Sequence, residues 1–406
     1  MVSFVVSLLL IFRLIYLIFF KYRKGILYPE YFILLPPFFL FVIPYYINGC
    51  RDLSNLTLFG LVIVLLVSFI SSKNIYNSIK LKQKKILISK KFNLISILAY
   101  IYLFVLIITI YNLLKSSSLF EILISNRLEN YFEESIDTGS VLGSFSIVLS
   151  FFYYIKISQL FIEKKYLLAS VFIIVELIYL VLFAVTRLSI VFPVISIILF
   201  LLLIFKISFK KTIFFSISLL FFLMFYLSYS NKLRTGQDSS QKISLTETFT
   251  DISRELDYEN FHNMAYNYVK MNDYEYGYGW FLGSVVNFIP RFLYPNKPVT
   301  SAANRFTEKI TGSPPSMYNP VITFTLIGDG YLQLGYIGII INILVFYFIS
   351  SIIFWKLYFI PDNIGVYPAI RFSFMAFIYF RAEIPFVQYF IYLVFLWFFY
   401  KFSYER

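Results

Sequence analysis

The chain has 406 residues, of which 59% are hydrophobic and 22% aromatic, and its mean hydropathy is +0.77. Soluble domains are only about half apolar, whereas several apolar runs here reach the roughly 20 residues that a helix needs to cross a bilayer. The composition therefore predicts an all-α polytopic membrane protein and favours helices over the short alternating strands of a membrane barrel.

The net charge of +13 comes from 35 lysines and arginines against 22 acidic residues. Seven of the lysines lie between residues 73 and 91, and others lie in further short connections between apolar runs. Basic groups in short loops are typical of the cytoplasmic side of a membrane protein. We therefore expect a lipid bilayer around the chain and no nucleic-acid partner.

Apolar runs bounded by charge predict about eleven spans. They lie near residues 2–20, 31–48, 56–72, 92–114, 140–162, 166–185, 188–205, 212–229, 324–355, 366–380 and 386–401. Placing the lysine-rich loops inside puts the N-terminus outside and the C-terminus in the cytoplasm. The chain then divides into a bundle of about eight spans over residues 1–229, a large outer loop over 230–323 and about three further spans over 324–406.

Charged residues and prolines inside these apolar runs allow further predictions. The first run lacks a basic segment and a small-residue cleavage site, so we expect it to be retained as a span, with Arg13 snorkelling or facing the bundle. Prolines in the second run predict a kink; they are Pro36, Pro37 and Pro44. Three further charged residues fall inside predicted spans and are expected to pair or to line a cavity; they are Lys156, Glu176 and Arg371.

The outer loop is rich in aromatic residues, which disordered segments lack. Residues 244–270 are predicted to form one amphipathic helix, and residues 278–292 a second helix near the membrane surface. His262, the only histidine, lies in the first of these. It is either an acid or base on the outer side or a structural histidine.

Cations gather around the outer loop and the outer ends of the spans. Arg187 opens the predicted span over 188–205, where it either binds an anion or snorkels to the interface. Arg291, Lys297 and Arg305 lie in a segment bounded by prolines, where they match a diphosphate in charge and geometry or else touch lipid headgroups. Further candidate substrate contacts are Arg254, Tyr331 and Arg381.

Asp329 follows the outer loop at the start of the span over 324–355, between Gly328 and Gly330. It is either a general base or a helix N-cap. Gly335 and Gly338 are expected to allow close packing. The sequence has no P-loop or His-Glu-x-x-His pattern, and its single cysteine excludes a cysteine-based metal cluster, so we expect no metal and no cofactor.

The chain resembles the Wzy-type polymerases of O-antigen, capsule and exopolysaccharide repeat units, which are GT-C-like membrane glycosyltransferases related to O-antigen ligases. Those proteins have about a dozen spans, a large outer loop and outward-facing arginines. The local match covers Ile289-Pro290-Arg291, Tyr294-Pro295-Asn296-Lys297-Pro298, Gly328-Asp329-Gly330-Tyr331 and Leu334-Gly335-Tyr336-Ile337-Gly338. The chain departs from the family in two ways, because no glycine follows Arg187 or Arg291 in an Arg-x-Gly pattern and Asp329 stands where many relatives have Glu.

The resemblance implies a bacterial inner-membrane enzyme that transfers a growing glycan from undecaprenyl diphosphate to a new lipid-linked repeat unit on the outer face. It implies that Arg187 and Arg291 hold the donor diphosphate and that Asp329 or His262 takes the acceptor proton. Lys297, Arg305 and Arg381 would assist. It also implies a chain-length regulator and a flippase as partners.

Two other functions stay open from the sequence. A flippase or transporter of lipid-linked oligosaccharide would also be polytopic and bind a diphosphate, although it is expected to have paired halves. An O-antigen ligase shares the architecture and often uses an outer histidine, which would give His262 a direct role.

Overall fold

The computed structural model describes the helical parts of the chain in several stretches. These are residues 2–17, 29–47, 49, 53–70, 92–116, 141–183, 188–205, 258–280, 286, 294, 302–313, 325–360, 363–381, 389–390 and 392–397. Every regular element among them is a helix. The all-α class is therefore confirmed for these residues.

The helices coincide with the predicted apolar runs. They are α1 (Val2–Tyr16), α2 (Glu30–Pro37), η3 (Phe38–Val42), α3 (Ile43–Ile47), α4 (Asn55–Phe69), α6 (Phe92–Ser116), α9 (Val141–Ile162), α10 (Tyr166–Phe183), α11 (Leu188–Ile204), α17 (Leu326–Tyr358) and α18 (Val366–Arg381). Two helices of the outer loop are also described, α14 (Glu259–Met271) and α16 (Ala302–Thr311). The predicted run over 212–229 lies outside the described residues.

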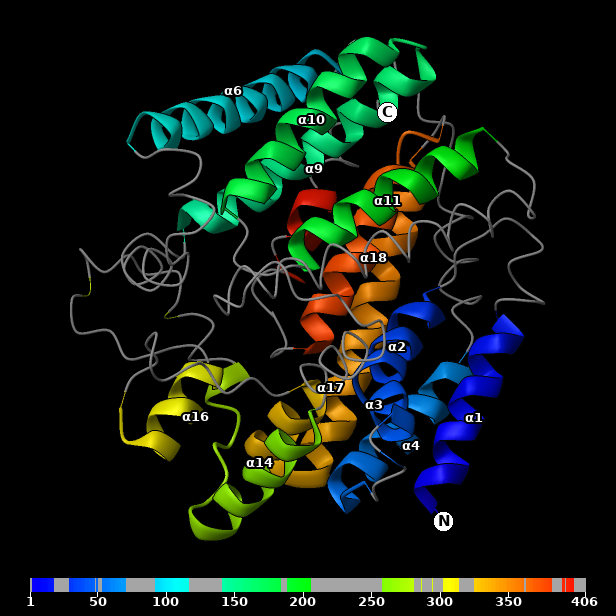
Figure 1. The fold of residues 1–406 in the computed structure, drawn as a ribbon, viewed down its shortest axis with the longest axis vertical. Coiled ribbons are helices and arrows are strands. Elements are labelled where there is room, and N and C mark those ends of the chain that lie inside the picture. Colours follow the sequence, from blue (N-terminus) through cyan, green and yellow to red (C-terminus); the bar gives the residue numbers. More distant parts are fainter. Residues whose placement is uncertain are drawn as a thin grey trace, which may run out of the picture.

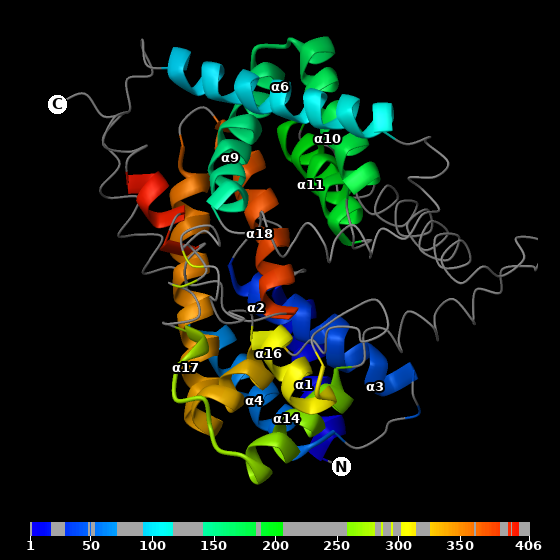
Figure 2. The same cartoon turned by 90° about the vertical axis from the view of Figure 1, so that its left-hand side faces the viewer.

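The lengths of the described helices do not confirm eleven membrane spans. Within the described stretches, two helices are long and apolar enough to cross a membrane, over Ile95–Lys115 and Leu326–Tyr358, and seven apolar helices are shorter. Helix α6 also runs across the upper end of the molecule in both views and not along its long axis (Figures 1 and 2). The number of eleven spans therefore stays a prediction.

The prolines of the second run, which predicted a kink, flank a change of helix type. Between Pro37 and Pro44 the backbone forms the π-helix η3, and the N–H of Ile43 donates to the carbonyl of Phe38 five residues back. A proline supplies no N–H and its ring crowds the preceding turn. The wider π turn relieves that crowding and keeps the segment helical.

The helices separate toward two ends of the molecule. The lower end in Figure 1 holds α14, α16 and the start of α1, while α6, α9, α10 and α11 form the upper end, and α17 with α18 run between them (Figures 1 and 2). The turn at Lys164 and Lys165, between α9 and α10, lies at the upper end. The predicted placing of basic loops and outer loop on opposite sides of a membrane stays a prediction.

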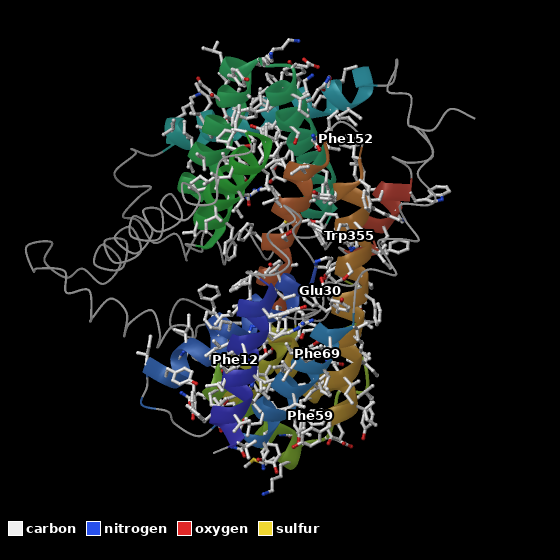
Figure 3. The ribbon with its side chains drawn as sticks, turned by 90° about the vertical axis from the view of Figure 1, so that its right-hand side faces the viewer. Phe12, Glu30, Phe59, Phe69, Phe152 and Trp355 are labelled. Atoms are coloured by element: carbon white, nitrogen blue, oxygen red, sulfur yellow. The ribbon has the colours of Figure 1, made fainter. Side chains whose placement is uncertain are left out.

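Two apolar cores follow this division. One surrounds α17 and includes residues of α1, α2, α4 and α18, with Trp355 fully buried; the other joins α6, α9, α10 and α11 to α18. Large apolar side chains also cover the outside, such as Phe12 and Phe69, which are 59% and 61% exposed (Figure 3). Apolar surface of this kind suits contact with lipid.

Charged side chains of the predicted spans turn inward. Arg13 donates from Nη2 to the carbonyl of Ser68 at 2.7 Å and lies over the ring of Phe69, so it faces the bundle. Lys156 donates to Ser96 and Gln159.

A buried ion pair joins α10 to α18. Arg371 Nη2 lies 2.6 Å from Glu176 Oε1, and it also donates to the hydroxyl of Tyr154 at 2.7 Å. The prediction that these span residues pair is therefore confirmed for Glu176 and Arg371.

Candidate functional site

Helix α17 is a hairpin of two helical arms. Its backbone leaves helical geometry at Leu334 and Gly335, where Gly335 has a φ of +63°. The amide of Asn342 nevertheless donates to the carbonyl of Leu326 at 3.1 Å, whereas a straight helix would put these residues about 24 Å apart. The short arm, residues 326–333, therefore folds back along the long arm, residues 336–358.

Two glycines allow the arms to touch. A Cβ added to Gly338 would lie 1.9 Å from the carbonyl oxygen of Gly330, and one added to Gly330 would lie 2.6 Å from the carbonyl oxygen of Gly338. No side chain fits in this space, because heavy atoms do not approach so closely. The predicted packing role is confirmed for Gly338, while Gly335 supplies the left-handed turn.

Asp329 lies inside this hairpin and is only 1% exposed. Its Oδ2 accepts from the amide of Asn342 at 2.8 Å and from the indole N–H of Trp280 at 3.2 Å. Its Oδ1 has one longer contact, 3.5 Å from the amide of Gln333. The carboxylate is thus fixed by neutral donors, and Oδ1 keeps capacity to accept another hydrogen bond or a proton.

The residue that caps α17 is Thr325, not Asp329. The hydroxyl of Thr325 accepts from the N–H of Ile327 at 3.2 Å, which is the usual bond of an N-cap. Asp329 lies one turn further on, and its N–H donates to the carbonyl of Thr325. The predicted N-cap role of Asp329 is therefore wrong.

The segment after α14 is fastened to the tip of the hairpin. The N–H groups of Glu275 and Tyr276 donate to the carbonyls of Leu332 and Gln333 at 2.8 and 2.9 Å. The side chain of Gln333 also donates to Glu275 at 2.8 Å and accepts from the N–H of Gly279 at 3.2 Å. These bonds bring Trp280 to Asp329.

His262 lies between the first turns of α4 and α17 and is fully buried. Its Nδ1 is 2.7 Å from the hydroxyl of Thr57, and its Nε2 is 2.9 Å from the hydroxyl of Thr325. Thr57 in turn donates to Oε2 of Glu259 at 2.6 Å. Burial lowers the pKa of His262 to about 3, so the ring is neutral at neutral pH.

Helix α14 is shorter than predicted at its N-terminal end. It begins at Glu259, because Tyr258 is its N-cap and not part of the helix. Residues 244–257 lie outside the described part of the chain, as does most of the predicted helix over 278–292. Its buried residues lie three apart, at Glu259, His262 and Ala265. This spacing gives one inward face, which packs on α4 and α17.

A cluster of tyrosines covers the hairpin tip. The ring of Tyr331 stacks on Tyr266 with centroids 5.8 Å apart and meets Tyr274 and Tyr336 edge-on. Tyr331 is buried, whereas Tyr266 and Tyr336 are each 41% exposed. Phe59 supports Tyr336 from α4 at the lower end of the molecule (Figure 3). Tyr331, two residues after Asp329, thus connects the short arm to half-exposed tyrosine rings.

The predicted site residues are therefore brought together only in part. Asp329, His262 and Tyr331 lie at the same end, around the short arm of α17. The backbone of two others lies in α16 and at the end of α18; these are Arg305 and Arg381. The remaining four lie outside the described residues; these are Arg187, Arg254, Arg291 and Lys297.

Several polar residues of this region were not predicted. Ser54 is a favoured N-cap residue and so was a visible signal for the start of α4, where its Oγ accepts from the N–H of Thr57 at 3.3 Å. Asn342 stands out as a polar residue in the apolar run of α17. No sequence pattern indicated a role in this site for Trp280, Glu259 or Thr325, because their partners are distant in the sequence.

Comparison with models of known protein families found no match, and comparisons with curated proteins and with solved structures found none either.

Proposed function

We propose that this chain is a membrane glycosyltransferase that joins lipid-linked oligosaccharide repeat units into a surface polysaccharide. The acceptor hydroxyl attacks the anomeric carbon of the donor glycan, the bond from that carbon to the diphosphate oxygen breaks, and the polyprenyl diphosphate leaves. The hydroxyl proton passes to a protein base. The resemblance to the Wzy-type polymerases is the source of this proposal.

The observation that carries the proposal is the buried carboxylate of Asp329 in a broken helix, two residues before Tyr331, on which half-exposed tyrosine rings pack. Non-helical backbone at the end of a membrane helix is tolerated where it is buried in protein or lines a cavity. Tyrosine rings offer apolar faces to the C–H groups of a sugar and hydroxyls to its polar edge. A proton acceptor next to such rings suits the attack of a sugar hydroxyl.

Of the two proposed bases, the geometry favours Asp329. Both ring nitrogens of His262 are bonded to threonine hydroxyls, and its lowered pKa makes it a poor acceptor at neutral pH. Among the described residues, the hydrogen-bond contact of Asp329 Oδ1 is the 3.5 Å one to Gln333. The ligase alternative, which draws on an outer histidine, is disfavoured for the same reason.

The donor diphosphate needs cations, and the candidates are the residues inferred from the resemblance. Developing negative charge on the leaving oxygen is stabilised by preorganised guanidinium groups in a partly dry site. Arg187 and Arg291 are proposed for this role. Replacing either with Ala should abolish long lipid-linked glycan on a gel, and normal polymer in both variants would refute the assignment.

The base is tested by Asp329→Asn with Asp273→Asn as its control. Asp273 is an exposed carboxylate of the same outer segment, bonded to Tyr274 and Tyr276. Loss of a general base lowers rates about 100-fold or more. We expect D329N to lose long glycan while D273N keeps it, with both proteins monodisperse in detergent. Wild-type polymer from D329N would exclude the base.

Transport of a lipid-linked oligosaccharide is the second candidate. It is favoured by the broken helix α17 together with the buried Glu176–Arg371 pair, because transporters place discontinuous helices and paired charges at their substrate pathways. Vesicles containing the purified protein and a labelled lipid-linked repeat unit separate the two functions. A transporter moves the label between leaflets without lengthening the glycan, whereas a polymerase lengthens it.

A further inference from the structure

The hydrogen bonds around His262 fix where its proton lies. The hydroxyl of Thr57 has one proton, which it donates to the Glu259 carboxylate, an acceptor only. Thr57 Oγ1 must therefore accept from His262, so Nδ1 carries the hydrogen. Nε2 of a neutral ring is then an acceptor.

The other side of the ring agrees with this assignment. Thr325 Oγ1 already accepts from the N–H of Ile327, and its own proton is available for Nε2 of His262 at 2.9 Å. The bonds thus run in one direction, from Thr325 through His262 and Thr57 to Glu259. The ring of Phe41 lies 5.0 Å from that of His262 and covers it.

This chain of bonds connects three segments that are far apart in the sequence. Thr57 belongs to the first turn of α4, His262 to α14, and Thr325 caps the short arm of α17. The carbonyl of Thr325 also accepts from the N–H of Asp329 at 2.9 Å. One turn after His262, Tyr266 stacks on Tyr331. Helix α14 therefore contacts the short arm on both sides of Asp329.

We propose that His262 is a positioning residue, held as the neutral Nδ1–H tautomer, that fixes the short arm of α17 and so the Asp329 carboxylate. Its bond to Thr325 secures the start of the arm, and its bond to Thr57 secures α14 to α4. The importance of this position for activity rests on the proposed function. The tautomer and the placing of Asp329 can be tested without it.

Nitrogen NMR of histidine tests the tautomer directly, because the chain has one histidine. We expect a protonated Nδ1 and an unprotonated Nε2, with no change between pH 8 and pH 5. A protonated Nε2, or a titration within that range, would overturn the assignment.

The indole N–H of Trp280 reports on the placing of Asp329, since it donates to Oδ2. Its resonance can be assigned by Trp280→Phe among the three tryptophans. In His262→Ala we expect this resonance to move and polymer formation to fall at least tenfold. His262→Asn, whose amide N–H keeps the bond to Thr57, should show smaller changes in both.

Thr109→Val is the matched control, because Thr109 is a half-buried threonine whose hydroxyl donates within its own helix, to the carbonyl of Val105. It should leave the Trp280 resonance and the polymer unchanged.

Loss of polymer in H262A with an unmoved Trp280 resonance would show that His262 acts in the chemistry itself and would overturn the positioning role. If the wild-type protein makes no polymer but the tautomer and the Trp280 shift are as expected, the proposed function fails and the positioning role stands.

Discussion

Two regions of the molecule bury charged or polar groups, and the hydrogen-bond partners of these groups differ in kind between the two regions. In the lower region, around Asp329 and His262, acidic groups meet neutral amide, indole and hydroxyl donors. In the upper region Glu176 and Arg371 meet as opposite charges, and Glu176 Oε2 and Arg371 Nε have no hydrogen-bond partner in the part of the chain that the structure describes. Asn342 Oδ1, in the lower region, likewise has no hydrogen-bond partner among the described residues.

The difference bears on function. Neutral donors hold a carboxylate in place while leaving it without a counter-charge, so it can still take up a proton or face a substrate. A direct ion pair satisfies charge but ties both groups to each other. We therefore expect substitutions in the lower region to reduce activity. Substitutions in the upper region should mainly reduce the stability of the fold.

The largest stability effect is expected for Glu176→Ala. It leaves the buried Arg371 guanidinium without its counter-charge, which costs about 3–5 kcal/mol. Thermal unfolding in detergent measures the loss. The double variant E176L/R371M removes both charges and should recover most of the stability; if it is no more stable than E176A, the ion pair is not the cause.

Gly338→Ala should come next, at about 3 kcal/mol, because its Cβ would overlap the carbonyl of Gly330 and force the hairpin arms apart. Since Asp329 lies between the arms, polymer formation should also be lost. Denaturation and the glycan gel check the two effects. An alanine variant with wild-type stability would contradict the close contact of the arms.

Lowering the pH should weaken the lower region by a smaller amount. His262 has a pKa of about 3 in the folded chain, below its usual value of about 6.5, so the unfolded chain takes up the proton first as the pH falls. Its stabilising contribution is complete above pH 6.5 and is lost progressively toward pH 3. Between pH 7.5 and pH 5 the loss is about 2 kcal/mol.

The control for this pH effect is His262→Gln, which should lack that part of the pH dependence. Glu259 accepts from Thr57 on one side of the ring, Asp329 follows Thr325 by one turn on the other, and both carboxylates remain in the variant. Equal pH dependence of unfolding in the wild type and in H262Q would contradict the buried neutral histidine.

The smallest effect is expected at the surface of the lower region. Lys309 Nζ lies 3.6 Å from Glu275 Oε1, and its side chain is 47% exposed. Pairs of this kind contribute about 0.5 kcal/mol or less in water. Lys309→Met should therefore change the unfolding temperature little. A large loss would mean that Glu275 needs this charge in order to hold Gln333.

The helices themselves were predictable because apolar runs of helix length are bounded by charge, as in α4, α6 and α10. Prolines indicated an irregularity in the second run, but as a kink and not as the π-helix near Phe38. The folded-back α17 was not predicted, since Gly335 and Gly338 indicated close packing without showing that the two arms of one run pack on each other. A hydropathy pattern does not distinguish a straight helix from a hairpin of the same residues.

The site was predictable only at Asp329, His262 and Tyr331, which stand out by residue type and place. Their partners did not, because Thr57 and His262 are 205 residues apart and His262 and Thr325 are 63 apart. Such pairs are brought together by packing of α14 on α4 and α17, which no local pattern encodes. The N-cap of α17 could not be assigned from the sequence either, because Asp329 and Thr325 are both good capping residues.

The reversal within α17 also sets the direction of its peptide dipoles. The short arm runs opposite to the long arm, so its positive end, the first turn after Thr325, lies back along the long arm near Asn342 and away from the tip. Asp329 lies in that first turn. Its negative charge is therefore stabilised by the dipole of its own short helix, by about 0.3–1 kcal/mol.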